Sequence, residues 1–170
     1  MKKMKRKTPI SAHTLAKEGP AVTTNREARR DYFVLETLEA GIILAGCEVK
    51  SLREGNASLA GSFARLEKEA VHLHNFYVAP YLMGNRENPD PLRVKKLLLH
   101  KSQIHKLRVK TAEKGLALIP LRVYFNDHGI AKVELAVARG KNATDKRSEI
   151  KKESAKREID RAIKNKNRRQ

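Results

Sequence analysis

The stretch ALIPLRVYFNDHGIAKVELAVA, residues 117–138, decides the fold class. Residues 117–125 and 131–138 have the composition of two β-strands, and the Asn-Asp-His-Gly segment 126–129 between them is typical of a turn. In the second run, apolar side chains alternate with Lys and Glu, as in a strand with one buried face. We therefore predict an antiparallel hairpin over these residues.

Shorter runs towards the N-terminus indicate more strands and a few helices. Further strands are predicted at 32–38, 42–44, 62–66 and 70–78, with Gly41 as a turn between the first two and 67–69 as a hairpin tip. Short helices are predicted from the N-cap Asn25, over 48–53 before Gly55, and over 101–110, whereas residues 80–91 read as a long loop.

About six closely spaced strands and two or three short helices favour antiparallel connections. A small antiparallel sheet removes its exposed edges when it closes on itself. We therefore predict a mainly β fold with short helices, an oligonucleotide-binding-like (OB-like) closed antiparallel barrel over residues 25–140. An open α+β sheet is the alternative, since periodicity does not separate the two.

Positive charge is concentrated at the two ends of the chain. The 170 residues carry a formal net charge of +18, of which residues 1–30 hold +7 and residues 139–170 hold +8. We interpret residues 1–24 as a flexible basic arm and residues 141–170 as a basic tail that is disordered until bound. Such ends predict a polyanionic partner, with binding that weakens steeply as salt is added.

Several classes of protein are disfavoured by what the sequence lacks. No apolar run reaches the roughly 18–20 residues needed to cross a bilayer, so we expect a cytoplasmic protein that is not in a membrane. The single cysteine, Cys47, cannot form an internal disulfide. Phosphate-loop, dinucleotide and nucleophile-elbow motifs are missing, and the His72 and His74 pair has no third ligand at informative spacing. We expect no enzyme, metal or cofactor.

Four strings together resemble one bacterial family, the SsrA-binding proteins, also called small protein B. The strings are Asn-Arg-Glu-Ala at 25–28, Glu-Ala-Gly-Ile at 39–42 with Gly-Cys-Glu-Val-Lys-Ser-Leu-Arg at 46–53, Asp-Pro-Leu-Arg-Val-Lys-Lys-Leu-Leu-Leu-His at 90–100, and Arg-Gly-Lys at 139–141 with Asp-Lys-Arg at 145–147. Each string is weak evidence by itself, but their order and spacing cover about residues 20–150.

The resemblance implies a function without catalysis. A family member of this kind grips the tRNA-like domain of transfer-messenger RNA (tmRNA), stands in for its missing anticodon arm and accompanies it to ribosomes stalled on messages without a stop codon. Its C-terminal tail becomes ordered in the decoding centre, against small-subunit RNA, and in the empty mRNA path. The resemblance thus predicts tmRNA and the ribosome as partners and a monomer when free.

Site residues follow from the resemblance position by position. Asn25, Glu39, Leu98 and His100 match places where the family binds this RNA, and Lys95 and Lys96 lie in the same string and are candidates for phosphate contacts. Three of these residues have a structural alternative: Glu39 orients a neighbouring Lys or Arg, Leu98 belongs to the core, and His100 caps a helix.

The junction between body and tail also matches the family. Gly140, Lys141, Asp145, Lys146 and Arg147 are expected to meet ribosomal RNA there, and the alternative is a solvated run of charges. Thr144 replaces the histidine or aromatic residue of many relatives, so stacking at that place is in doubt. Two other functions remain open, a general RNA-binding or ribosome-assembly protein and an RNA-processing enzyme.

Overall fold

The computed structural model describes residues 18–112, 115–142, 145 and 161. These residues form a mainly β fold with few helices, as predicted. The strands are β1 (Glu18–Thr24), β2 (Tyr32–Ile42), β3 (Ala57–Ser58), β4 (Phe63–Glu67), β5 (Ala70–His74), β6 (Tyr77–Val78), β7 (Lys95–Leu98), β8 (Leu116–Asn126) and β9 (Ala131–Gly140). The helices are α1 (Arg26–Asp31), α2 (Gly46–Arg53), the 3-10 helix η1 (Leu82–Glu87) and α3 (Lys101–Ala112).

Backbone pairing connects six strands into an uneven ring. The order β8-β4-β5-β7-β2-β9 returns to β8 through the β8–β9 pairing, and all pairs are antiparallel. The β2–β9 and β8–β9 ladders are long, whereas among the described residues β4 meets β8 at the one pair Ala64 and Leu118. β3 and β6 form a separate two-stranded sheet.

The hairpin predicted over 117–138 is confirmed and is longer than expected. At its turn, Asn126 Oδ1 accepts hydrogen bonds from the backbone N–H groups of His128 (3.2 Å) and Ile130 (2.8 Å). Gly129 adopts φ +71°, a conformation that favours glycine. The hydrogen bonds accepted by the Asn126 side chain and the positive φ at Gly129 thus form the turn that connects β8 and β9.

The main core fills the inside of the ring. Alternate residues of β9 point inwards, and Val133 and Leu135 have no exposed surface. They pack with buried side chains from β2, β4, β5, β7 and β8, such as Leu73, Leu97 and Val123. Truncating a fully buried leucine of this kind to alanine costs about 2–5 kcal/mol.

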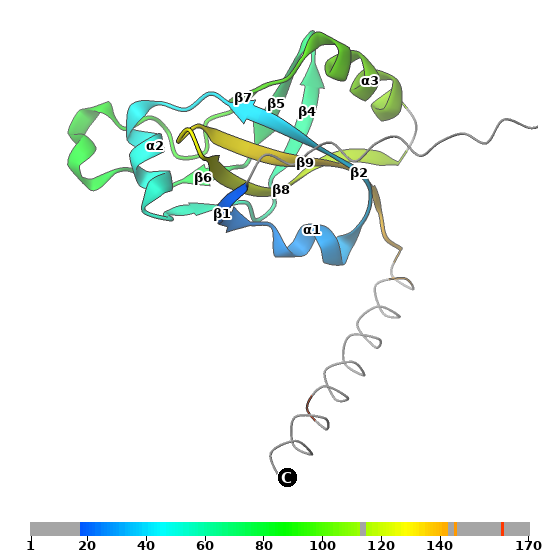
Figure 1. Cartoon of the computed structure of the whole chain (residues 1–170), viewed down its shortest axis with the longest axis horizontal. Coiled ribbons are helices and arrows are strands. Elements are labelled where there is room, and N and C mark those ends of the chain that lie inside the picture. The colour runs from blue at the N-terminus through cyan, green and yellow to red at the C-terminus, as the bar shows by residue number, and fades with distance from the viewer. Residues whose placement is uncertain (1–17, 113–114, 143–144, 146–160, 162–170) are drawn as a thin grey trace, which may run out of the picture.

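A smaller core lies on the outer side of β8 and β9, under α1. Ala28 of α1 packs there with Ile119 and Leu121 of β8 and with two alanines of β9, Ala136 and Ala138. Figure 1 shows α1 along this end of the sheet, with α2 and α3 at opposite ends of the molecule. Among the described residues, outward side chains of β7 such as Lys96 and Leu98 are exposed.

The structure corrects the predicted N-terminal boundary. Residues 18–24, which sequence reading assigned to the flexible arm, form β1 and pair with the C-terminal half of β8, for example Ala21 with Tyr124. Gly19 and Pro20 obscured this strand in the sequence, because both residues are depleted in strands. Residues 1–17 of the predicted arm lie outside the described residues.

Other predicted boundaries shift within the body. Gly41 is not a turn, because β2 continues through it to Ile42, and β5 ends at His74 before a left-handed Asn75 with φ +56°. The predicted loop over 80–91 contains η1. The helices at Asn25, 48–53 and 101–110 are confirmed with small changes in length.

None of the helices in the described segments is both long and apolar enough to cross a membrane.

Candidate nucleic-acid interface

Glu39 lies on the exposed outer face of β2, where two partners fix its carboxylate. Lys132 Nζ donates a 2.8 Å hydrogen bond to Oε1, and the hydroxyl of Tyr124 donates to Oε2. These two hydrogen bonds, led by that of Lys132, hold the pKa of the Glu39 carboxyl below its usual value. Glu39 is therefore an ionised acceptor at neutral pH, and its predicted alternative role, orienting a lysine, is also present.

Strand register places Leu98 and Lys96 on the same face as Glu39. Leu98 pairs with Gly41, which stands two residues from Glu39, and Lys96 precedes Leu98 by two residues. Paired residues of neighbouring strands, and residues two apart along one strand, share a face. Leu98 is 53% exposed, so the alternative that it belongs to the core is wrong. We use the term strand face for the outer surface formed by Glu39, Lys96 and Leu98, with Lys132 beside them.

Gly41 gives the strand face its close packing. A Cβ built on Gly41 would lie 3.2 Å from Leu98 Cβ, which is tighter than ordinary side-chain contact. The glycine thus lets β7 and its Leu98 side chain approach β2 closely.

His100 and Asn25 lie at helix starts away from the strand face. The backbone N–H of His100 donates to Gln103 Oε1 (2.9 Å), and its carbonyl accepts from the N–H groups of Gln103 and Ile104 at the start of α3. The backbone of His100 therefore caps α3 while its side chain is exposed. Asn25 is mostly buried and caps α1 through Oδ1, which accepts from Ala28 N (3.0 Å).

The amide nitrogen of the Asn25 side chain connects α1 to β8. Its Nδ2 donates to the carbonyl of Pro120 (3.2 Å), and its backbone N–H donates to the carbonyl of Leu121 (2.7 Å). The side chain thus has a structural role in addition to the RNA contact that the resemblance predicts.

The prediction that Lys95 meets phosphates is wrong. Lys95 has no exposed surface, and its Nζ donates to the carbonyls of Phe76 (2.9 Å), Pro91 (3.1 Å) and Arg93 (3.1 Å). The reason is strand alternation: Leu97 points into the core, so Lys95 points inwards with it and Lys96 points out.

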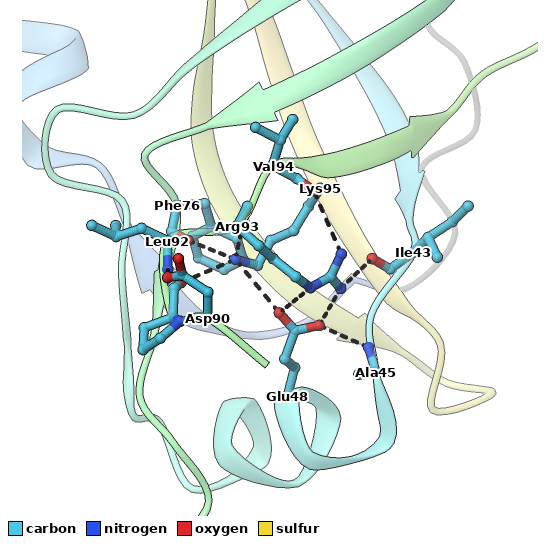
Figure 2. Close-up of polar contacts among 10 residues, drawn as sticks. Ile43, Ala45, Glu48, Phe76, Asp90, Leu92, Arg93, Val94 and Lys95 are labelled. Atoms are coloured by element: carbon cyan, nitrogen blue, oxygen red, sulfur yellow. Dashed lines mark hydrogen bonds and ion pairs between the residues drawn. The ribbon is translucent and has the colours of Figure 1, made fainter. Parts of the chain in front are cut away.

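Figure 2 shows that Lys95 and Arg93 converge on Glu48 of α2. Lys95 Nζ lies 3.5 Å from Glu48 Oε1, Arg93 Nε donates to the same oxygen at 2.9 Å, and Arg93 Nη2 donates to Oε2. Burial lowers the pKa of the Lys95 ammonium, and the charge of Glu48 opposes that shift. Glu48 also accepts from Ala45 N (2.7 Å), so this buried network fixes the start of α2 against the segment that leads into β7.

The predicted junction residues divide into two groups. Gly140 ends β9 and is exposed, whereas Lys141 is 8% exposed and belongs to the folded body, which corrects its assignment to the tail. Lys141 N donates to Asp31 O (2.9 Å) and Lys141 Nζ donates to Arg29 O (2.8 Å), so Lys141 closes the C-terminal end of α1. Lys141 thus has a structural role, and its contact with ribosomal RNA stays a prediction.

Beyond Asn142, the structure describes only residues 145 and 161 of the predicted tail. Asp145 Oδ2 accepts from Asn142 N at 3.3 Å. Lys146, Arg147 and Thr144 lie outside the described residues.

The strand face combines groups whose chemistry suits a folded RNA. A lysine such as Lys96 can bind phosphate oxygens, a leucine such as Leu98 can contact a sugar or base, and an ionised carboxylate such as that of Glu39 can accept from exocyclic amines or a guanine edge. In the segments that the structure describes, no three His, Cys, Asp or Glu side chains are placed to hold a metal ion.

Sequence reasoning missed the partners of Glu39. Lys132 and Tyr124 come from β9 and β8, more than eighty residues further along the chain. The alternation of β9 correctly predicted that Lys132 faces outwards, but one sequence contains no signal for the register that brings it opposite Gly41.

Known proteins agree with the resemblance that the four strings suggested. A family model described as SmpB protein matches residues 22–165. The SsrA-binding protein of Desulforudis audaxviator (strain MP104C) is 59% identical over 145 residues, 85% of this chain and 94% of the relative. That of Geobacillus thermodenitrificans (strain NG80-2) is 51% identical over 146 residues, 86% of this chain and 94% of the relative.

A solved structure extends the likeness to three dimensions. It is described as "tmRNA-SmpB: a journey to the center of the bacterial ribosome", and one of its chains matches with a TM-score of 0.62 at 52% sequence identity. The match covers 75% of this chain and 92% of that chain. The chain belongs to the SmpB family of SsrA-binding proteins.

Proposed function

We propose that this chain is a noncatalytic RNA-binding factor of ribosome rescue. Its strand body binds the tRNA-like domain of tmRNA, stands in for the missing anticodon arm and brings the RNA to ribosomes that lack a stop codon in the decoding site. Residues beyond Asn142 then enter the decoding centre and the empty mRNA path. This function places the protein in the cytoplasm, where it acts without a cofactor.

The observation that carries the proposal is the strand face. Three of the residues that the family resemblance assigns to RNA, Glu39, Lys96 and Leu98, stand exposed on adjacent strands. The ionised carboxylate of Glu39 cannot donate a hydrogen bond, so it selects donor groups such as base amines rather than phosphates. A face of this kind reads a particular RNA surface instead of binding any polyanion.

We also propose that the ring of strands works as a closed OB-like barrel. The return of the pairing order to β8 and the apolar core inside the ring support this arrangement. A closed body has few free strand edges and keeps its outer face rigid for recognition.

The strand face is tested by reversing the charge of Glu39. Glu39→Arg should weaken binding of the full chain to the tRNA-like domain, although the change adds positive charge, because the acceptor is lost. Glu54→Arg is the matched control, since Glu54 is exposed at the far end of α2 and bonds Asn56. Unchanged affinity of a folded Glu39→Arg protein, measured by fluorescence anisotropy, would remove Glu39 from the site.

The tail is tested separately by ending the chain after Asn142, which keeps the Lys141 contacts with α1. Much of the affinity for the tRNA-like domain should remain, while peptide tagging on stalled ribosomes should be lost. Tagging by the shortened chain at the full rate would contradict the division of labour between body and tail.

A further inference from the structure

A groove of about 680 Å³ lies beside the strand ring and has no part in the proposed function. It runs between α1 and β4, and its lining includes Asn25, Tyr32, Phe63, Arg65 and Leu118. This volume is within the roughly 300–1,000 Å³ of sites that bind small ligands.

The groove exists because the ring of pairings is weak at this point. β4 and β8 pair at Ala64 and Leu118, and residues 63–66 of β4 and 116–119 of β8 line the groove on either side of that contact. The Asn25 contacts with β8 hold α1 as the opposite wall. The groove is thus built mainly by two strands and a helix, with the turn residues Gly61 and Ser62 at its edge.

Phe63 presents an aromatic surface at the groove. Its ring is stacked on His74 of β5, with the ring centroids 5.1 Å apart and the planes inclined by 9°. Phe63 lines the groove and is still 40% exposed, so part of its side chain is accessible to a ligand there. Open aromatic faces on the strands of small β-barrels are stacking platforms for unpaired bases.

Arg65 places a positive charge beside this platform. It follows Phe63 by two residues, so both side chains share the outer face, and its neighbours in register are His72 and then Lys96 of the strand face. The side chain of Arg65 is exposed. Arg65 therefore lies on the same face of the sheet as Lys96, two strands away.

Two acids, Glu27 and Asp31, line the groove, and both face the same guanidinium. Asp31 and Glu27 lie 3.2 Å and 3.9 Å from Arg30 Nη2. The charge of Arg30 reduces the repulsion of a phosphate by these two carboxylates.

We propose that this groove binds an unpaired nucleobase of the partner RNA, stacked on Phe63, with Arg65 at its phosphate. The inference rests on the proposed function, since the RNA is the one that the strand face binds, and it adds a second contact point on the same molecule. An unpaired base fits the site because a base within a duplex has no free face to stack.

Tryptophan fluorescence tests the stacking directly, since the chain contains no tryptophan. In Phe63→Trp the single indole should be quenched when the tRNA-like domain of tmRNA is added to saturation. Tyr77→Trp is the matched control, because Tyr77 is 41% exposed on β6, outside the groove lining, and its emission should stay unchanged.

The outcomes separate this inference from the proposed function. If Phe63→Trp binds the RNA with wild-type affinity and its emission does not change, the nucleobase site is refuted while the strand face stands. If the wild-type chain fails to bind the RNA at all, the proposed function itself fails.

Affinity gives a second readout. Phe63→Leu should raise the Kd for the tRNA-like domain roughly 5- to 150-fold, the range that corresponds to losing one stacked base, and Phe63→Tyr should restore it. Arg65→Gln should reduce the slope of log Kd against log salt by about one, whereas the exposed Lys106→Gln of α3 should not. A wild-type Kd for folded Phe63→Leu would overturn the proposal.

Discussion

Glu48→Ala should destabilise the fold strongly, because Glu48 is the buried carboxylate of an ion-pair network. The substitution removes the carboxylate that faces Arg93 and the fully buried Lys95, and it leaves the N–H of Ala45 without its acceptor. Removing one partner of a buried ion pair costs about 3–5 kcal/mol because the remaining charge stays uncompensated. Since a domain of this size loses about 4 °C of Tm per kcal/mol, the Tm should fall by about 12–20 °C.

Urea and thermal unfolding followed by far-UV circular dichroism measure this loss. Glu54→Ala is the control at the opposite end of α2, since the Glu54 carboxylate accepts from the exposed Asn56 and the change should stay within about 0.5 kcal/mol. The double variant Glu48→Leu with Lys95→Met should recover part of the loss, because both buried charges are then absent. A loss of less than about 1 kcal/mol in the free energy of unfolding of Glu48→Ala would refute the claim that this ion-pair network stabilises the fold.

The same variant has a predicted pH dependence. Burial lowers the pKa of Lys95 below its ordinary value of 10.5, so at alkaline pH the unfolded chain binds more protons than the folded chain and stability rises with pH there. Glu48 raises this pKa, so its removal extends that window to lower pH. The stability difference between wild type and Glu48→Ala should therefore shrink as the pH rises through the alkaline range towards 10.5.

Three further changes test the strand face and the junction. Lys132→Met should raise the pKa of Glu39, as measured by NMR titration. In wild type, the lowered pKa of Glu39 contributes stability that is present above pH 4.5 and is lost as the pH falls through the pKa of the folded protein, and Lys132→Met should remove part of this contribution. Gly41→Val should push Leu98 aside and weaken RNA binding several-fold with a small change in Tm, as measured by anisotropy and calorimetry. Lys141→Met should cost about 1–3 kcal/mol in urea unfolding, because a carbonyl at the end of α1 loses its donor.

Each of these changes has a control and a contradicting result. Lys106→Met on α3 should leave the pKa of Glu39 unchanged, and an unshifted pKa in Lys132→Met would exclude the lysine as its cause. A Cβ at Gly46 would lie in open space, so Gly46→Val should not change RNA affinity. An equal loss of RNA affinity in Gly41→Val and Gly46→Val would contradict the role of close packing at Leu98. Arg139→Met, at an exposed position of β9, should lower the free energy of unfolding much less than Lys141→Met does. Equal losses in the two variants would refute the role of Lys141 as a cap of α1.

The hairpin, the helices and the mainly β class could be predicted because their signals are local. Apolar alternation in β9, the turn at Asn126 and the cap at Asn25 each depend on residues close together in the chain. β1 could not be read in this way, since Gly19 and Pro20 weaken its pattern and it is stabilised by pairing with β8, about a hundred residues away.

The site was predictable only in part, and the two adjacent lysines show why. In a strand one of Lys95 and Lys96 must face inwards, and the burial of Leu97 settles that it is Lys95. Two of its carbonyl partners, those of Pro91 and Arg93, are close by in the chain, but Phe76 and Glu48 come from other segments, so the sequence offers no sign that a buried ammonium is satisfied there. The Glu39 contacts with Lys132 and Tyr124 depend in the same way on long-range register.

Competition binding tests the central claim most directly, namely that the strand face recognises one folded RNA and does not simply bind polyanions. A labelled tRNA-like domain of tmRNA is bound to the full chain at physiological salt and displaced with the unlabelled domain or with ordinary tRNA. We predict that the unlabelled domain displaces the label at much lower concentration, and that Glu39→Arg removes this preference. Equal displacement by both RNAs from the wild-type chain would contradict the claim and would favour a general RNA-binding protein.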